Sequence, residues 1–447
     1  MVLKGSNLYY YLVVITLIVS WSPLKSVAYL LPIISFTLFY LFRKNIKYIS
    51  YRLLVITLVT VFHLMLLLLL GRELILQNIL ISIITYSGIV FFISTPTPKI
   101  DTELYIKISK FVLLVILFQA IIGISQGLLQ FIKVGYFDLA TGDAVEGTIH
   151  LLPIPSGSFS NVMFASLMSL SILGVLPYIL FFDRSKFWVI FLGVISLILS
   201  SVMHLILILT VCLITSYFLL KPKILKVVPL SLKVIIVVLV IGSPFLAVNL
   251  LPTNFSNVVP LINKTLELET PKSIVYSRIL NEMPDDYSLM PIIGLGPGQF
   301  SSRAALIGTE HYIGSYNTPT NLPLIEPIFA PPLEKYLLDQ WLYVVNLPYS
   351  AGSTLAPFSS WMSIITEFGF IVFGIIIFYL FRHLVKIKRK CRVNKKYKII
   401  SFSNVTIILL MFFLGFQENY WEVSQTIFIG ILFFKITLGY FNRVENN

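Results

Sequence analysis

The chain has 447 residues, of which 57% are hydrophobic and only 12% are charged. An ordinary soluble domain carries about 25% charged residues, so this composition excludes a soluble enzyme, a disordered chain and a small disulfide scaffold. It indicates a membrane protein with many spans. In such a protein the net charge of +13 reflects how Lys and Arg are distributed between the loops on the two sides of the bilayer.

Apolar segments that can cross a bilayer occur along most of the chain. A spanning helix needs about 20 apolar residues, and charged residues, Pro and Gly separate the segments from one another. The uncharged run 187–220 is divided at Ser200-Ser201, because one helix of that length would exceed the hydrocarbon thickness. We therefore expect an all-α polytopic membrane protein with about 12 transmembrane helices. The predicted spans lie at residues 7–22, 26–42, 52–71, 74–94, 105–125, 159–182, 187–200, 201–220, 227–248, 356–381, 399–416 and 423–441.

The distribution of charge predicts the orientation of these spans. An even number of spans places both termini on one side, and most of the 33 Lys and Arg residues then fall on that side, including those of the loop 382–398. Because cytoplasmic loops carry an excess of Lys and Arg, we expect both termini to be cytoplasmic. Cys212 lies in a span and Cys391 in a cytoplasmic segment, so we expect neither a disulfide nor a cysteine metal site.

Three regions follow from this topology. Residues 1–248 contain spans one to nine with a shorter outer loop at 126–158, residues 249–355 form a large outer loop, and residues 356–447 contain spans ten to twelve. Within the large loop, residues 332–347 can form an amphipathic helix that lies either along the outer membrane surface or inside the loop. Its apolar residues recur at four-residue spacing: Leu333, Leu337, Trp341 and Val345.

The large loop contains a glycine-rich motif. Arg278 is followed by fifteen residues and then by Gly294-Leu295-Gly296-Pro297-Gly298-Gln299-Phe300. Glycines permit a tight turn and the close approach of a ligand, and consecutive amides in such a turn can bind an anion. A guanidinium can bind phosphate oxygens in a fork. The motif therefore predicts either a phosphate site or a simple bend of the loop.

With its neighbours, this motif resembles the bacterial O-antigen polymerase and O-antigen ligase superfamily over residues 150–380. The resemblance is carried by the Arg and Gly-x-Gly-x-Gly-x-Phe pattern in a large outer loop, and three further stretches agree with it in order and spacing. These are Ser156-Gly157-Ser158-Phe159-Ser160-Asn161, the serine pair Ser200-Ser201, and Pro357-Phe358-Ser359 followed by Glu367-Phe368-Gly369 and Gly374.

Two departures favour the polymerase branch. Ligases carry a His just after the Pro of the last stretch, whereas this chain has Phe358. Many members have Ser-Arg where this chain has Ser200-Ser201 followed by Val202, and His204 lies a turn deeper. These differences count against a ligase.

The resemblance implies a glycosyltransferase that works by inverting transfer at the outer face of the bacterial inner membrane. The donor would be a glycan on undecaprenyl diphosphate and the acceptor one repeat unit on the same carrier, so that a surface polysaccharide such as that of lipopolysaccharide grows. The lipid diphosphate is the leaving group, and no nucleotide, metal or other cofactor is expected. The expected partners are this lipid-linked oligosaccharide, membrane lipid and a chain-length regulator protein, but no nucleic acid.

Such a reaction needs cations for the diphosphate and a base for the acceptor hydroxyl. The base candidates are His311, because the unperturbed pKa of a histidine is near neutral, and Glu367, because a carboxylate at membrane depth is a functional candidate. Glu367 can instead hold the loop through hydrogen bonds to Ser or Tyr side chains. His150 is a weaker candidate for the base.

Aromatic residues of the loop can stack on sugars or anchor the loop at the membrane interface. The diphosphate candidates are Arg278, Arg303, Arg72, Gly294, Gly296 and Gly298, and the sugar-contact candidates are Tyr312, Tyr316 and Trp341.

Three other functions remain open at this point. A ligase would pass the glycan to a different acceptor. A transporter or flippase for lipid-linked glycans would suit twelve spans, but the two halves show no repeat and no charge relay at the midplane. A peptidoglycan-type polymerase would use an acidic loop residue, for which Glu282 or Asp285 could serve.

Overall fold

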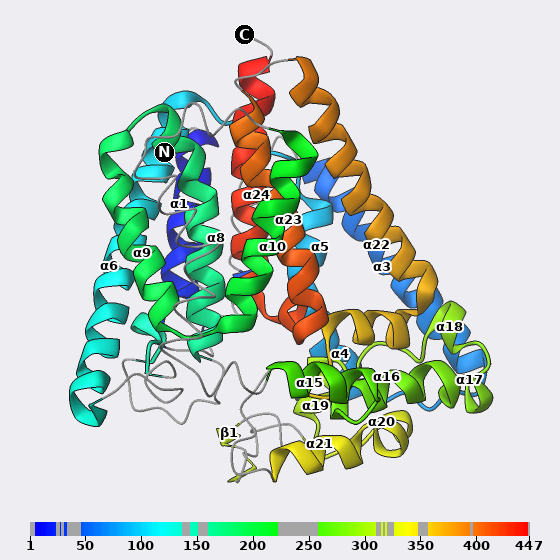
Figure 1. Ribbon diagram of the computed structural model, residues 1–447. Helices are drawn as coiled ribbons and strands as arrows, with labels where there is room; N and C mark the ends of the chain where they lie inside the picture. Colours follow the sequence, from blue (N-terminus) through cyan, green and yellow to red (C-terminus); the bar gives the residue numbers. More distant parts are fainter. Residues whose placement is uncertain are drawn as a thin grey trace.

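The computed structural model of the protein is almost entirely helical (Figure 1). Within the described part of the chain the strands are β1 (Gly314–Ser315) and β2 (Thr318–Pro319), which pair antiparallel. Seven of the described helices are long and apolar enough to cross a membrane, so the chain is a helical, multi-pass membrane protein. The structure describes residues 5–23, 27, 31–33, 46–135, 144–150, 160–221, 258–309, 314–315, 318–319, 326–346, 356–393 and 397–445.

Helix α24 (Ser424–Glu445) is the centre of the helical bundle. Its most apolar stretch is 100% buried, and it packs against α1, α8 and α23. Because the helices that surround it are apolar on all sides, their outer faces are suited to lipid. The other helices of this bundle are α1 (Gly5–Ser20), α6 (Thr102–Val134), α8 (Ser160–Phe181), α9 (Phe187–Leu199), α10 (Met203–Leu220) and α23 (Tyr397–Gln417).

Two long helices, α3 (Ile46–Leu69) and α22 (Ser360–Val393), expose large apolar side chains. Phe62 on α3 is 69% exposed and Phe378 on α22 is 66% exposed. Side chains of this kind are stable against hydrocarbon, so both helices present lipid-facing surfaces. Near its start α22 changes direction (Figure 1) at Gly369, whose φ of 79° and ψ of 168° lie in a region confined essentially to glycine.

The described residues between 258 and 346 form a layer at one end of the bundle, opposite the end where α1 begins and α24 finishes (Figure 1). The layer has its own apolar core, which includes Phe300 and Trp341 and is completed by Phe358 just before α22. Helix α4 (Leu76–Thr85) reaches this layer and contacts α19. The described helices of the layer are α15 (Val258–Leu266), α16 (Pro271–Asn281), α17 (Met283–Asp286), α18 (Met290–Ile293), α19 (Arg303–Ile307), α20 (Pro331–Tyr336) and α21 (Leu338–Val345).

The amphipathic segment predicted at 332–347 packs inside this layer. It is two helices, α20 and α21, which are separated at Leu337 by a non-helical ψ and φ pair. Its four apolar residues are all in the core, with exposed fractions between 0% and 3%. Of the two expected positions, the one within the loop is therefore confirmed.

The predicted spans agree with the structure in part. The division of 187–220 is confirmed, because α9 ends before Ser200 and Ser201 has a positive φ of 49°. The predicted span 74–94 is instead two short helices, α4 and α5 (Ser87–Ser94), separated at Tyr86. Most of the predicted span at 26–42 and all of the one at 227–248 lie outside the described residues.

Candidate functional site

The glycine-rich motif forms a tight turn, residues 294–298, between α22 and α4. Gly294, Gly296 and Gly298 have φ values of 79°, 107° and 73°. A Cβ atom on Gly294 would lie 2.3 Å from the carbonyl of Glu367, and one on Gly298 would lie 2.5 Å from the carbonyl oxygen of Asn78. Only glycine fits at these two positions, because each requires both a positive φ and backbone in direct contact.

The bend of α22 at Gly369 also requires glycine, because the backbone that precedes the glycine turn packs against it. On the other side of the contact, a Cβ atom on Gly369 would lie 2.1 Å from the carbonyl oxygen of Ile292. His63 on α3 reaches the same place, where its Nε2 lies 2.6 Å from the carbonyl oxygen of Ile293. The glycine turn and the bend of α22 are thus packed backbone against backbone, and His63 ties α3 to this contact.

Glu367 is fully buried at the centre of this contact. Its Oε2 accepts a hydrogen bond from the backbone N–H of Gly298 at 2.6 Å. Its Oε1 accepts from the backbone N–H groups of Phe300 at 3.1 Å and Ser302 at 3.0 Å. The segment 298–302 is therefore an anion-binding arrangement of backbone amides, and the anion that it binds is a carboxylate of the same chain.

This geometry counts against a diphosphate on the three glycines. The N–H of Gly294 donates to the carbonyl of Met290, that of Gly296 to the carbonyl of Glu367, and that of Gly298 to its carboxylate. Both oxygens of Glu367 also accept backbone hydrogen bonds. Of the two roles expected for this residue, base or anchor of the loop, the contacts favour the anchor, with backbone amides as its partners.

Arg278 is held in an ion pair within the layer. Its two terminal nitrogens lie 2.6 Å and 2.8 Å from the carboxylate oxygens of Asp339, and one also donates to the carbonyl of Tyr336 at 3.1 Å. The hydrogen bonds to Asp339 raise the pKa of Arg278 above its ordinary value. Arg278 thus joins α16 to α20 and α21, and its side chain is only 23% exposed.

A second buried carboxylate lies in the turn between α23 and α24, which contains the helical turn η6 (Tyr420–Glu422). The Oε2 of Glu422 accepts a hydrogen bond from the backbone N–H of Arg303, and its Oε1 accepts from the hydroxyl of Tyr86 at 3.1 Å. The guanidinium of Arg303 interacts electrostatically with both Glu422 and Glu418. This turn therefore meets the layer at the N-terminus of α19.

Glu418 and Lys272 extend this group of charges. The Nζ of Lys272 donates to the carbonyl of Gln417, and its charge interacts with the carboxylate of Glu418. His204, near the start of α10, lies close enough to Lys272 to interact with its charge. We name Lys272, Arg303, Glu418 and Glu422 the charged junction.

Burial perturbs the titration of these groups. It raises the pKa of Glu422 to about 8, and the charge of Glu367 contributes to this rise while Arg303 opposes it. Burial also raises the pKa of Glu418, against the opposing effect of Lys272 and Arg303, and it lowers the pKa of Lys272. Carboxyl groups shifted towards neutral pH beside cations are typical of functional sites.

The sequence prediction included only Arg303 of the charged junction. Glu418 and Glu422 carry a signal that could have revealed them, since two acids stand four residues apart in the short turn between two predicted spans. Lys272 carries no such signal. It meets the end of α23 through its hydrogen bond to the carbonyl of Gln417 and interacts there with Glu418, which only the folded chain brings near it.

The remaining predicted residues have different surroundings. The guanidinium of Arg72 lies 4.6 Å from the centre of the Tyr287 ring, so it joins the end of α3 to the layer. Trp341 is 1% exposed and packs edge-on against Phe358 at 5.0 Å, which removes it from any sugar-binding surface. His150 ends the short helix η3 (Gly147–His150), which packs on α6 and α8. The other candidates lie outside the described residues: His311, Tyr312 and Tyr316.

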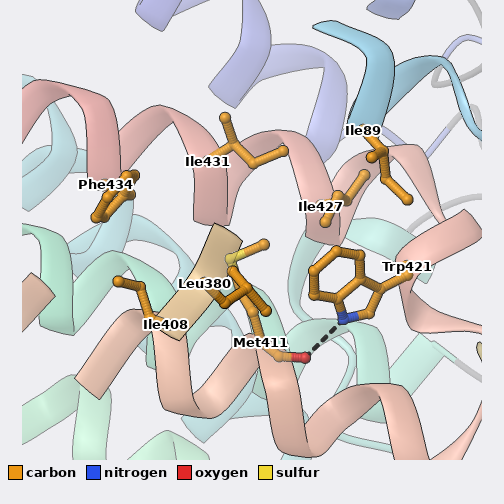
Figure 2. Close-up of a pocket in the computed structure, with 8 residues that line it drawn as sticks. All are labelled: Ile89, Leu380, Ile408, Met411, Trp421, Ile427, Ile431 and Phe434. Carbon is orange, nitrogen blue, oxygen red and sulfur yellow. Dashed lines mark hydrogen bonds between the residues drawn. The ribbon is translucent and has the colours of Figure 1, made fainter. Parts of the chain in front are cut away.

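A small apolar pocket lies between α5, α22, α23 and α24 (Figure 2). Trp421, the neighbour of Glu422, lines it and donates a hydrogen bond to the carbonyl of Met411 at 2.7 Å. The other lining residues are Ile89, Leu380, Ile408, Ile427, Ile431 and Phe434. Among the described residues, no group of three or more His, Cys, Asp or Glu could hold a metal ion.

Comparisons of the chain with known protein families, with characterised proteins and with solved structures find no significant match.

Proposed function

We propose that the protein is a polysaccharide polymerase that joins lipid-linked oligosaccharide repeat units by inverting glycosyl transfer at the outer face of the bacterial cytoplasmic membrane. One observation carries the proposal. Two of the four stretches on which the resemblance rests, the glycine turn and Glu367-Phe368-Gly369, are at least 69 residues apart in sequence, yet they pack backbone against backbone.

The position of this contact supports the proposal. It lies where the layer of residues 258–346 meets the ends of the spanning helices, beside the charged junction. A lipid-linked substrate has its carrier in the bilayer and its sugars outside, so its diphosphate must lie at such a boundary.

The reaction that we propose needs no nucleotide. An acceptor hydroxyl attacks the anomeric carbon of the donor, the bond from that carbon to the diphosphate breaks, and the diphosphate leaves with the electron pair. Arg303 and Lys272 are the cations of the charged junction that could stabilise this leaving group. Arg278, in contrast, is engaged by Asp339 and supports the layer. His311, Tyr312 and Tyr316 remain candidate contacts with the sugars.

We also propose twelve spans with both termini in the cytoplasm and the layer outside. The start of α1 and the end of α24 lie at the end of the bundle away from the layer, as this topology requires (Figure 1). A chain-length regulator would then meet the protein at its outer face or within the membrane.

The test uses material from a strain that lacks the gene. Such a strain is expected to accumulate single lipid-linked repeat units, which can be extracted and given to the purified protein without nucleotide or added metal. Lengthening into a ladder of products supports the polymerase. Transfer of the glycan to a different lipid acceptor would instead identify a ligase. Movement of intact units across a vesicle membrane without lengthening would identify a flippase and exclude our proposal.

A further inference from the structure

The three buried carboxylates near the contact differ in what holds them. Glu367 accepts hydrogen bonds from three backbone N–H groups. Glu422 accepts one from the backbone of Arg303 and one from the hydroxyl of Tyr86. The buried carboxylate of Glu418 instead interacts electrostatically with the side chains of Lys272 and Arg303, and the Nζ of Lys272 is placed beside it by its hydrogen bond to the carbonyl of the preceding residue, Gln417.

This difference has a chemical consequence. A backbone N–H within a packed turn cannot leave its acceptor without local unfolding, so Glu367 and Glu422 are fixed. The charged ends of Lys and Arg can move when a stronger anion arrives, and a diphosphate is a stronger anion than one carboxylate. Substrate binding can therefore draw the cations of the charged junction towards the diphosphate and leave Glu418 able to accept a proton.

The main chain beside Glu418 is well fixed, although its carboxylate has side-chain partners. Its carbonyl oxygen accepts hydrogen bonds from the N–H and the hydroxyl of Ser360, both at 3.1 Å. The next residue, Asn419, donates from its side chain to the carbonyl of Ser301 at 2.9 Å. The turn is thus hydrogen-bonded both to the start of α22 and to the layer. These bonds fix the main chain of Glu418 where the layer meets the spanning helices.

We propose that Glu418 is the general base of the polymerase and that Lys272 and Arg303 bind the donor diphosphate. The inference rests on the function proposed above. As the acceptor oxygen forms its bond to the anomeric carbon, its proton passes to the carboxylate of Glu418. The bond between that carbon and the diphosphate oxygen breaks at the same time, and the electron pair leaves with the diphosphate held by the two cations. The proton is later released to solvent.

The surroundings of Glu418 suit this role. Burial raises the pKa of the carboxyl above its ordinary value while the two cations limit the rise, and a base is most effective when its pKa lies near the working pH. The charged groups that interact with Glu418 are Lys272 on α16 and Arg303 on α19. Beyond them, Glu422 on the same turn interacts with Arg303 and with Glu367 on α22, and His204 on α10 interacts with Lys272.

The experiment measures chain lengthening as a function of pH with lipid-linked repeat units extracted from the deletion strain. The wild type must first form ladders, because a wild type without activity refutes the polymerase itself. With an active wild type, Glu418→Gln is expected to slow lengthening by about 10²- to 10⁴-fold and to remove the fall in rate at low pH. Glu269→Gln, which removes an exposed carboxylate near α16, is the matched control and should keep the wild-type profile.

A second pair of variants separates chemistry from folding. Added formate is expected to restore part of the activity of Glu418→Ala, since a small carboxylate can occupy the vacated space, and it should not stimulate the wild type. Glu418→Asp should be slower than wild type yet keep the low-pH fall. An active wild type together with an unchanged pH profile in Glu418→Gln would overturn the assignment. So would a folded Glu418→Ala that formate does not rescue.

Discussion

The glycine turn and the charged junction lie side by side, and both centre on buried carboxylates. In the glycine turn the partners of Glu367 are backbone amides that the fold places and fixes. In the charged junction the partners of Glu418 are the side chains of Lys272 and Arg303, which an incoming anion can attract. A buried carboxylate that is bonded to backbone N–H groups fixes a loop, whereas one that interacts with movable cations is available for chemistry. Four substitutions test this distinction.

The largest loss of stability is expected for Glu367→Gln. Both oxygens of Glu367 accept backbone N–H groups, so an amide NH₂ must face at least one of these donors. A buried donor without an acceptor costs about 1–3 kcal/mol, and the collision of two donors adds to this. We expect a lower melting temperature in detergent and faster proteolysis near residues 294–303. A melting temperature equal to that of the wild type would contradict the anchoring role.

Gly294→Ala is expected to be nearly as damaging. Its φ of 79° and ψ of −174° are confined essentially to glycine, and a strained conformation of this kind costs about 1–3 kcal/mol. The new Cβ would also collide with the backbone of Glu367 at 2.3 Å. Gly71→Ala is the matched control, because Gly71 has a φ of 72° but no described atom within 4 Å of its Cβ position. Equal losses in the two variants would refute the close backbone contact.

A smaller effect, which depends on pH, is expected for Glu422→Gln. Gln can accept from the N–H of Arg303 and donate to the oxygen of Tyr86, so the variant should fold. The pKa of Glu422 is about 8 in the folded protein and lies near its ordinary value of 4.5 when unfolded. Between these values the folded state binds more protons, so the wild type loses stability as the pH rises from about 4.5 to 8. Melting curves should show that the melting temperature of the variant falls less than that of the wild type over this pH range.

The smallest effect on stability is expected for Arg278→Ala. The ion pair with Asp339 is partly exposed, and such pairs contribute about 0–1 kcal/mol. We expect a small drop in melting temperature and a loss of lengthening well below that of Glu418→Gln. A complete loss of activity in a folded Arg278→Ala would show that this arginine binds substrate and does not merely support the layer.

The sequence predicted the helical membrane fold well, because apolar length and charge are properties of local segments. It did not predict the break at Tyr86 within residues 74–94, which divides this stretch into α4, in contact with α19 of the layer, and α5. Composition does not reveal such a break, since the stretch is apolar enough for a span.

The candidate site was predictable only in part. The glycine motif and Glu367 were recognised as important, yet their mutual hydrogen bonds depend on packing between distant segments and could not be read from either segment. Arg278 stood out because it precedes the glycine motif, but its partner Asp339 lies 61 residues away. Lys272 and Glu418 meet only in the folded chain, which explains why the charged junction was missed.

The central claim is that each new glycosidic bond releases a lipid diphosphate at this site. The direct measurement is to count released undecaprenyl diphosphate and bonds formed in the same reaction, with repeat units labelled in both the sugar and the carrier. We predict one carrier released for each bond, no nucleotide requirement, and a parallel fall of both quantities in Glu418→Gln. Carrier release without bond formation, or movement of intact units without either, would contradict the account.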